Sequence, residues 1–185
     1  ADTVDGGGGA DRWEADKSGA TQALILSLMN TAGSSYTIDG LTGSVINIEA
    51  FGTDGSHPFQ SGSGNDNLTT HDGAYADYIA TNAGDDSVKV FAGTDIIAMG
   101  TGNDTLVVDY SANGYDKSSE FADAAYAWSG SLASGGYSGA YAYRANPADN
   151  GVPRVNFSGV ENFDVTLGSG NDVIRTGDGN DRLHG

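Results

Sequence analysis

The sequence contains no cysteine, and only 3 of its 185 residues are proline. The absence of cysteine excludes disulfide bonds, thiolate metal sites and a cysteine nucleophile. The three histidines, His57, His71 and His184, do not form HExxH or another zinc spacing. The sequence also has no nucleophile elbow, P-loop or dinucleotide fingerprint. No recognisable catalytic constellation remains, so we expect a protein that is not an enzyme.

Basic residues are scarce as well, with 8 Lys and Arg against 25 Asp and Glu and a net charge of −17. This charge repels nucleic acid and anionic membrane surfaces, and it favours cations or basic partners. A merely solubilising acidic surface, or disorder, is the alternative. No apolar run approaches the roughly 20 residues of a membrane span. We expect any export signal to lie outside this segment.

Glycine is abundant, at 29 residues, and much of it follows a period of nine. The units SGSGNDNLT, TNAGDDSVK, VFAGTDIIA and MGTGNDTLV each carry an aspartate at the sixth position, and LGSGNDVIRTGDGNDRLHG carries two more. The aspartates of this register are Asp2, Asp11, Asp66, Asp77, Asp86, Asp95, Asp104, Asp172 and Asp181. Asp77 keeps the nine-residue step to Asp86 but follows Asp66 by eleven residues. Regularly spaced carboxylates argue against a random acidic surface.

A hydrophobic residue stands two positions after each of these aspartates, as in Leu68, Val88 and Leu106. A glycine-rich turn followed by a short β-favouring triplet predicts a coil of alternating loops and very short strands, with the hydrophobic residue pointing inward. Glycines before the aspartate allow positive φ and close stacking of loops. These glycines are Gly64, Gly84, Gly93, Gly102, Gly170 and Gly179. Asparagine at the fifth position tolerates the left-handed region.

The pattern resembles the RTX (hemolysin-type) calcium-binding nonapeptide G-G-x-G-x-D-x-U-x over residues 1–14, 61–107 and 167–185. The resemblance implies an all-β fold, a parallel β-roll or β-helix solenoid in which two nonapeptides make one turn. It also implies Ca²⁺ held between stacked turns by the sixth-position aspartates and loop carbonyls, because Ca²⁺ prefers hard oxygen ligands. Applied here, Asp77 pairs with Asp95, and Asp86 with Asp104.

Some repeats depart from the nonapeptide motif, and we expect calcium ligation to be less complete there. Tyr75, Asn82 and Phe91 replace motif glycines, which makes ligation near those turns less complete. Asp172 and Asp181 each need a partner eighteen residues later, beyond the last residue given. We therefore expect that the chain is a piece of a longer repeat array, and that these two aspartates bind calcium less completely here.

Two inserts, about 15–60 and 108–156, lose the register but have similar boundaries. Each ends in a re-entry segment, INIEAF in the first and SGVENF in the second, before an identical GSGND. The chain is thus divided into two units, 1–107 and 108–185, and Glu49 and Glu161 occupy equivalent positions with an expected structural role. The inserts should add strands or loops to the roll: ALILSLMN, SVINIEAF and VPRVNFSGVENFDVTL predict strands, and a short helix is expected around Ser118–Trp128.

The second insert also carries aromatic residues on a Gly/Ser-rich run, among them Tyr126, Trp128 and Tyr141. Such residues can stack on sugars or on a surface protein, although their alternation fits half-buried strands equally well. The leading hypothesis is a non-catalytic, calcium-binding module of a secreted or surface bacterial protein that folds on Ca²⁺ after export, and the resemblance implies type I secretion. An adhesive or carbohydrate-binding module is the alternative, and a polysaccharide lyase or epimerase comes third.

Overall fold

The computed structural model describes residues 2–29, 33–111, 121–123, 126–142, 154–167, 171–173 and 176–185. For residues 121–123, 126–128, 142 and 171–173 only the backbone is described. These ranges contain nineteen β-strands and one 3₁₀ turn, η1 (Leu132–Ser134). The all-β class is therefore confirmed.

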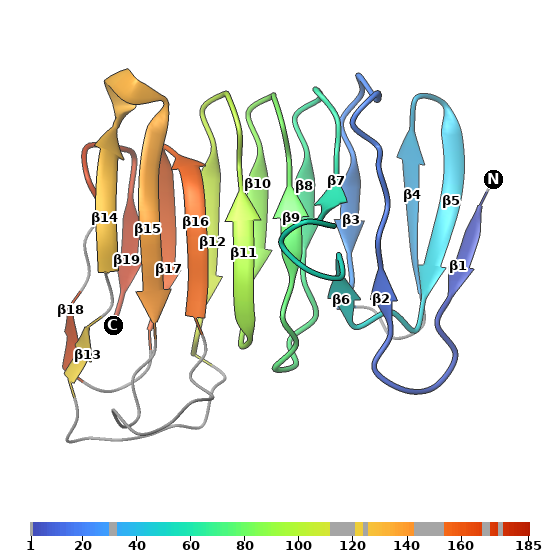
Figure 1. The fold of residues 1–185 in the computed structure, drawn as a ribbon, viewed down its shortest axis with the longest axis horizontal. Helices are drawn as coiled ribbons and strands as arrows, with labels where there is room; N and C mark the ends of the chain where they lie inside the picture. The colour runs from blue at the N-terminus through green and yellow to red at the C-terminus, as the bar shows by residue number, and fades with distance from the viewer. Residues whose placement is uncertain are drawn as a thin grey trace.

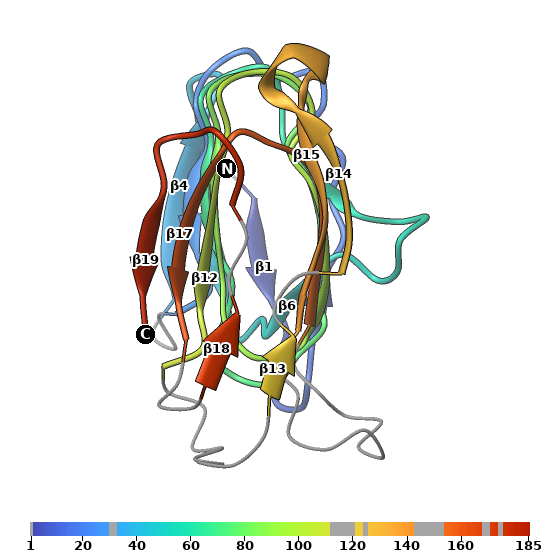
Figure 2. The same ribbon diagram turned by 90° about the vertical axis from the view of Figure 1, so that its left-hand side faces the viewer.

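The strands stack along the long axis of the molecule (Figure 1) and form two layers that face each other, seen end-on in Figure 2. The first six-stranded sheet has the order β19 (Arg182–His184), β17 (Asn162–Thr166), β12 (Thr105–Asp109), β10 (Ser87–Val90), β8 (Asn67–Thr69) and β3 (Ile25–Ser27). The second has the order β14 (Tyr126–Ser131), β15 (Gly136–Ala142), β16 (Arg154–Val160), β11 (Thr94–Ala98), β9 (Tyr78–Ala80) and β7 (Phe59–Gln60).

Every neighbouring pair in the first sheet is parallel, as is every pair from β16 to β7 in the second. Successive units alternate between the layers, since β9 and β11 lie in one sheet and β8, β10 and β12 in the other. This arrangement is the parallel β-roll that the resemblance implies.

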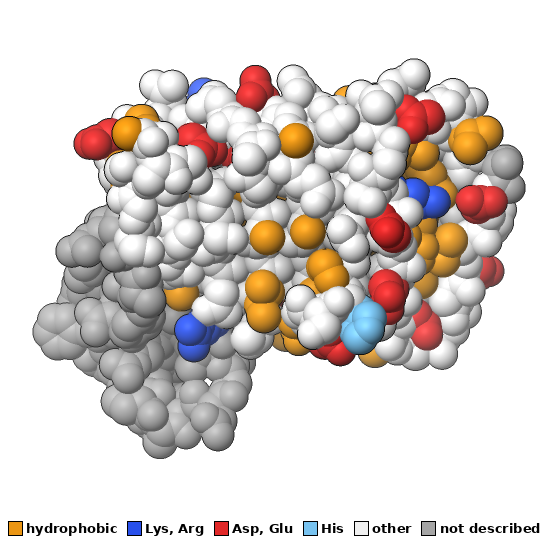
Figure 3. All heavy atoms as spheres, turned by 45° about the horizontal axis from the view of Figure 1, so that its top comes forward, with side chains coloured by type: hydrophobic (Ala, Val, Ile, Leu, Met, Phe, Trp, Pro, Cys, Tyr) orange, Lys and Arg blue, Asp and Glu red, His pale blue; other side chains and the backbone are white. Residues whose placement is uncertain are grey.

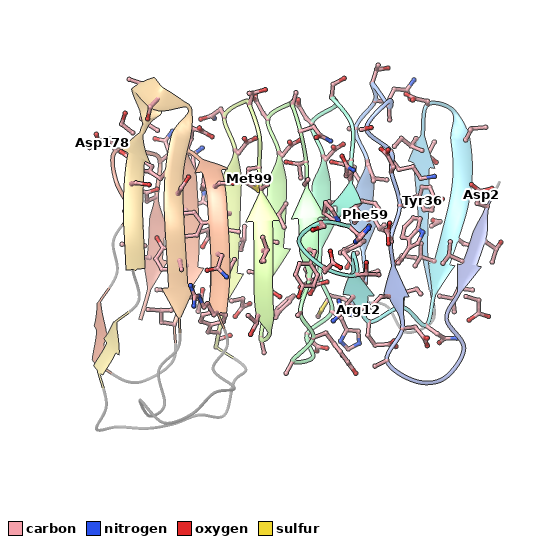
Figure 4. All side chains as sticks on the ribbon, viewed as in Figure 1. Asp2, Arg12, Tyr36, Phe59, Met99 and Asp178 are labelled. Atoms are coloured by element: carbon pink, nitrogen blue, oxygen red, sulfur yellow. The ribbon has the colours of Figure 1, made fainter. Side chains whose placement is uncertain are left out.

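The predicted inward residues form the core. Val88 lies opposite Leu68 on one side and Leu106 on the other, and all three are completely buried. Ile97 is paired in the same way with Ile79 and Phe157 in the opposite layer. Burying each such side chain contributes about 1.5–3 kcal/mol. Phe59 and Met99, labelled in Figure 4, are also fully buried in this core.

The first insert extends the stack toward the N-terminal end. Besides β3 it supplies a hairpin of β4 (Ser34–Ile38) and β5 (Leu41–Ile46), and β1 (Thr3–Asp5) pairs in parallel with β5. It also supplies β6 (Ala50–Phe51), which pairs with β2 (Arg12–Trp13). Trp13 packs against Tyr36 and Phe59, with ring centroids 5.5 and 5.1 Å away. An aromatic cluster thus joins this insert to the roll.

The second insert covers the opposite end. Strands β14 and β15 form an antiparallel hairpin that pairs with β16, and β13 (Phe121–Asp123) pairs with β18 (Asn171–Val173). The prediction that the inserts add strands to the roll is confirmed. The expected helix around Ser118–Trp128 is wrong for its described part, because Phe121–Asp123 and the residues from Tyr126 onward are strands. Cross-strand pairing with β15 and β18 decides the conformation there.

Candidate metal centre

Aspartates of the repeat link successive turns through the backbone. The N–H of Asp86 donates to Oδ1 of Asp104 at 2.9 Å, and the N–H of Asp77 donates to Oδ1 of Asp95 at 2.9 Å. Both bonds span eighteen residues. Asp77, Asp86 and Asp104 stand just before their strands, and Asp95 is the second residue of β11. Since β9 and β11 run in the opposite direction to β10 and β12 (Figure 1), Asp86 and Asp104 lie at one edge of the roll and Asp77 and Asp95 at the other.

Asp66 extends the first of these series. Its N–H donates to Oδ1 of Asp86 at 2.8 Å across twenty residues, so Asp66, Asp86 and Asp104 form what we call the aspartate row. The two additional residues lie in the loop between β8 and β9, which contains His71 and Tyr75. A spacing of eighteen residues does not join Asp66 to Asp86, because the loop lengthens this turn by two residues.

The second carboxylate oxygen of these aspartates is the most informative feature of the turns. Oδ2 of Asp66, Asp86, Asp95 and Asp104 is buried, and no hydrogen-bond donor among the described residues reaches it. The four residues are at most 2% exposed. A buried carboxylate oxygen without a donor is costly unless its charge is neutralised. Paired carboxylate oxygens of this kind are the ligands that Ca²⁺ prefers, so the turns fit this ion.

The pKa values of these aspartates also indicate that their negative charge is disfavoured in the turns. Burial raises the pKa of Asp77 and Asp104 to about 7 and that of Asp86 to about 6. Burial also holds the pKa of Asp95 well above its ordinary value, and the Asp77 carboxylate adds to this effect. The turns therefore bring acidic groups together in a place that disfavours their negative charge. Either protons or a cation can neutralise them.

The motif glycines let the turns approach one another. A Cβ placed on Gly102 would lie 1.8 Å from the carbonyl oxygen of Gly84, and one on Gly84 would lie 2.3 Å from that of Gly64. At the other edge, a Cβ on Gly93 would lie 1.9 Å from the carbonyl oxygen of Tyr75. A Cβ on Gly64 would lie 2.3 Å from the carbonyl carbon of Gln22, and one on Gly179 would lie 1.9 Å from the carbonyl oxygen of Glu161. Tyr75 thus keeps a carbonyl in the turn although it replaces a glycine.

Backbone carbonyl oxygens would have to complete the coordination of a calcium ion in the turns. Within the described ranges, no three His, Asp or Glu side chains gather closely enough to hold a metal on their own. A calcium ion needs six to eight oxygens, and the stacked aspartates supply only part of them. The remaining ligands would be turn carbonyls such as those of Gly84 and Tyr75.

The expected role of the fifth-position asparagines is wrong. Asn65, Asn103 and Asn180 are not among the residues with positive φ. Instead, the fifth-position side chains form their own series: the N–H of Asp85 donates to Oδ1 of Asn65 at 3.0 Å, and the N–H of Asn103 donates to Oδ1 of Asp85 at 2.9 Å. Satisfying a backbone donor outweighs the left-handed preference of asparagine. Asn82, which replaces a motif glycine, does take a positive φ of 69°.

The terminal repeats have fewer carboxylate contacts. Asp2 is exposed, and its carbonyl oxygen accepts the N–H of Ser44 at 2.9 Å. Oδ1 of Asp181 accepts the N–H of Phe163 at 3.0 Å. The side chain of Asp172 and the whole of Gly170 lie outside the described residues. Asp11 donates its N–H to Oε2 of Glu49 at 2.7 Å, and its own Oδ2 is buried without a donor among the described residues.

Sequence reasoning did not place any glutamate at these sites. Oε2 of Glu161 accepts the N–H of Asp104 at 2.8 Å, in the same way that Glu49 accepts from Asp11. The signal was available, because both glutamates stand in the repeated re-entry segments INIEAF and SGVENF.

Of the aromatic residues proposed for ligand binding, the structure describes the side chain of Tyr141. Tyr141 is fully buried, stacks on Phe157 with ring centroids 5.3 Å apart, and meets Phe163 edge-on at 5.7 Å. It is therefore unavailable for stacking on a sugar, because it fills the core beneath the second insert. The side chains of Tyr126 and Trp128 lie outside the described residues.

Acidic side chains are spread over the face of the turns that Figure 3 shows, where Lys and Arg are few. None of the described residues belongs to a helix that is long and apolar enough to cross a membrane. A family model described as the RTX calcium-binding nonapeptide repeat (4 copies) matches residues 1–12, 71–106 and 165–185. No curated protein matches the chain. The matched ranges overlap the three segments that carry the nine-residue register, and the last begins two residues before its segment.

Proposed function

We propose that the chain is a non-catalytic module that folds when calcium binds, because its residues 1–12, 71–106 and 165–185 match the RTX calcium-binding nonapeptide repeat, whose ion is Ca²⁺. The observation that carries this proposal is the set of buried Oδ2 atoms of Asp66, Asp86, Asp95 and Asp104, which have no donor among the described residues. Each of these carboxylates is buried within the stacked turns.

The proposed mechanism couples binding to folding. Bound calcium supplies the positive charge that the buried carboxylates lack. Asp86 and Asp104 would hold one ion and Asp77 and Asp95 another, one at each edge of the roll. In the unfolded chain the two carboxylates of a pair are eighteen residues apart, so a site forms only as the turns stack. The free energy of binding is then part of the free energy of folding.

We further propose that the chain works outside the bacterial cell. RTX repeats are typical of proteins that type I systems secrete, and a chain with net charge −17 would remain unfolded where calcium is scarce. Calcium outside the cell would then start folding after export. The two sequence units, 1–107 and 108–185, would fold into one roll, since β12 spans their boundary and pairs with strands on both sides.

Circular dichroism tests the coupling directly. We expect little β-structure in the presence of a chelator and a large gain when millimolar Ca²⁺ is added. Mg²⁺ at the same concentration is the control, because it holds its waters and demands octahedral geometry. A spectrum that does not change between chelator and Ca²⁺ would contradict calcium-coupled folding.

A further inference from the structure

The two re-entry segments make the same unusual contact with the aspartate of the preceding turn. The carbonyl oxygen of Asp104 accepts the N–H groups of both Glu161 and Asn162, at 3.2 and 2.8 Å. The carbonyl oxygen of Asp11 accepts those of Glu49 and Ala50 in the same way, at 3.0 and 3.1 Å. Each glutamate is thereby held beside an aspartate that precedes a long insert.

The phenylalanine of each re-entry segment, rather than the glutamate, contacts the aspartate of the following turn. The N–H of Phe163 donates to Oδ1 of Asp181 at 3.0 Å, and the N–H of Phe51 donates to Oδ1 of Asp77 at 2.7 Å. Both phenylalanines are buried. The register therefore shifts by two residues within each Glu-x-Phe. The glutamate meets the aspartate before it, and the phenylalanine meets the aspartate after it.

The glutamate carboxylate occupies the place that an aspartate takes elsewhere. Oε2 of Glu161 accepts the N–H of Asp104 at 2.8 Å, just as Oδ1 of Asp104 accepts the N–H of Asp86 at 2.9 Å. The first of these bonds joins residues 57 apart, and the second joins residues 18 apart. The aspartate row thus continues across the second insert with a glutamate as its next member.

The surroundings of Glu161 suit a buried carboxylate that receives a cation. Glu161 is 7% exposed and Asp104 is 0% exposed, and Oδ2 of Asp104 has no donor among the described residues. A Cβ on Gly136, which has φ of 86°, would lie 2.4 Å from Oε1 of Glu161. A glycine from the second insert therefore leaves the room that this carboxylate fills.

We propose that Glu161 and Glu49 are calcium ligands, so that one ion binds between Asp104 and Glu161 and another between Asp11 and Glu49. This inference rests on the proposed function. Each pair offers only oxygen atoms from carboxylates and backbone, the ligand set of Ca²⁺. The inserts would interrupt the sequence register but not the series of metal sites. Phe163 and Phe51 bring no oxygen-bearing side chain to Asp181 and Asp77, so each Glu-x-Phe ends one series of sites and begins the next.

The variants Glu161→Gln and Glu49→Gln separate a ligand from a structural residue. Glutamine keeps an oxygen that can accept the backbone N–H, and it removes the negative charge that strengthens the binding of a divalent cation. Glu14→Gln is the matched control, because Glu14 is exposed and its carboxylate only accepts from the Thr53 hydroxyl at 3.1 Å. Bound ions are counted by native mass spectrometry at saturating Ca²⁺, and circular dichroism gives the calcium concentration at the folding midpoint.

We expect each glutamine variant to bind one ion fewer than the unaltered chain and to fold at a higher calcium concentration. The double variant should bind two fewer, and Glu14→Gln should bind the same number. An unaltered chain that binds no calcium would refute the proposed function itself. An unchanged count and midpoint in Glu161→Gln, in a chain that does bind calcium, would overturn this inference alone. A folding defect that no calcium concentration restores would also overturn it.

Discussion

Asp104 accepts the backbone N–H of Asp86 with one carboxylate oxygen at 2.9 Å and keeps its other oxygen buried, without a donor among the described residues. The first oxygen sets the stacking of two turns. The second places an unneutralised charge between them. In Asp66, Asp86 and Asp95 as well, Oδ1 accepts a backbone N–H and Oδ2 is buried without a donor among the described residues. Stacking and the proposed calcium binding therefore depend on the same side chains.

Replacing Asp86 should weaken calcium binding more than replacing any exposed acid. Asp86 stands in the middle of the aspartate row, so Asp86→Asn removes a charge from the sites on both of its sides. We expect the calcium midpoint for folding to rise about tenfold or more, which corresponds to at least about 1.4 kcal/mol. Asp16→Asn is the control, because Asp16 is exposed and accepts from Ser18. Equal midpoints for the two variants in a calcium titration would argue against the row.

The motif glycines should not tolerate a methyl group. Gly102→Ala would place a Cβ 1.8 Å from the Gly84 carbonyl oxygen at a φ of 154°. We expect it to lower the free energy of unfolding of the calcium-loaded chain by about 2 kcal/mol or more, since strained backbone alone costs about 1–3 kcal/mol. Gly8→Ala is the control: its Cβ would meet nothing within 4 Å, and its effect should stay within about 0.5 kcal/mol. Urea unfolding of both variants measures the difference.

Two neighbouring isoleucines test the alternation in β11. Ile97 is 1% exposed and Ile96 is 42% exposed. Ile97→Ala should lower the free energy of unfolding by about 2–5 kcal/mol, because it leaves a cavity in the core. Ile96→Ala should cost less than about 1 kcal/mol, since its side chain is largely outside. If thermal or urea unfolding ranked the two variants in the opposite order, the register of β11 would be wrong.

The metal-free chain should be more stable in acid. Asp77 and Asp104 have a pKa of about 7 and Asp86 of about 6 in the folded chain, against 3.8 ordinarily. Between these values the folded chain holds more protons than the unfolded chain, so its free energy of unfolding falls as pH rises from about 4 to about 7. In chelator, β-structure should therefore be greater at about pH 5 than at about pH 8.

The pH dependence of calcium-induced folding should be opposite to that of the metal-free chain. Protons and calcium compete for the same carboxylates, so the calcium midpoint should be lower at about pH 8 than at about pH 5. Circular dichroism at both pH values, with chelator and with Ca²⁺, gives all four measurements. A metal-free chain that gains β-structure as pH rises would contradict the burial of the motif carboxylates.

The period of nine predicted much of this fold from the sequence. It identified Val88, Leu106 and Ile97 as inward residues, because the side chains of a short strand alternate and each repeat supplies one such strand. The resemblance to the RTX nonapeptide implied the pairs Asp77 with Asp95 and Asp86 with Asp104, which the structure places on adjacent turns. These relationships are local, so counting residues is sufficient.

The other contacts between turns cannot be predicted by counting residues along the sequence. Asp66 meets Asp86 only because a loop absorbs two additional residues. Glu161 meets Asp104 across 57 residues, and its place depends on how the second insert packs against the roll. The asparagine side chains bond the next turn for a similar reason: the backbone donors there exist only once the turns have stacked.

A crystal structure of the chain grown in Ca²⁺ would test the central claim most directly. We predict calcium, identified by its anomalous scattering, between Asp77 and Asp95 and between Asp86 and Asp104, with backbone carbonyls among its ligands at about 2.3–2.6 Å. A roll that forms in saturating calcium with no ion at either pair would contradict the account.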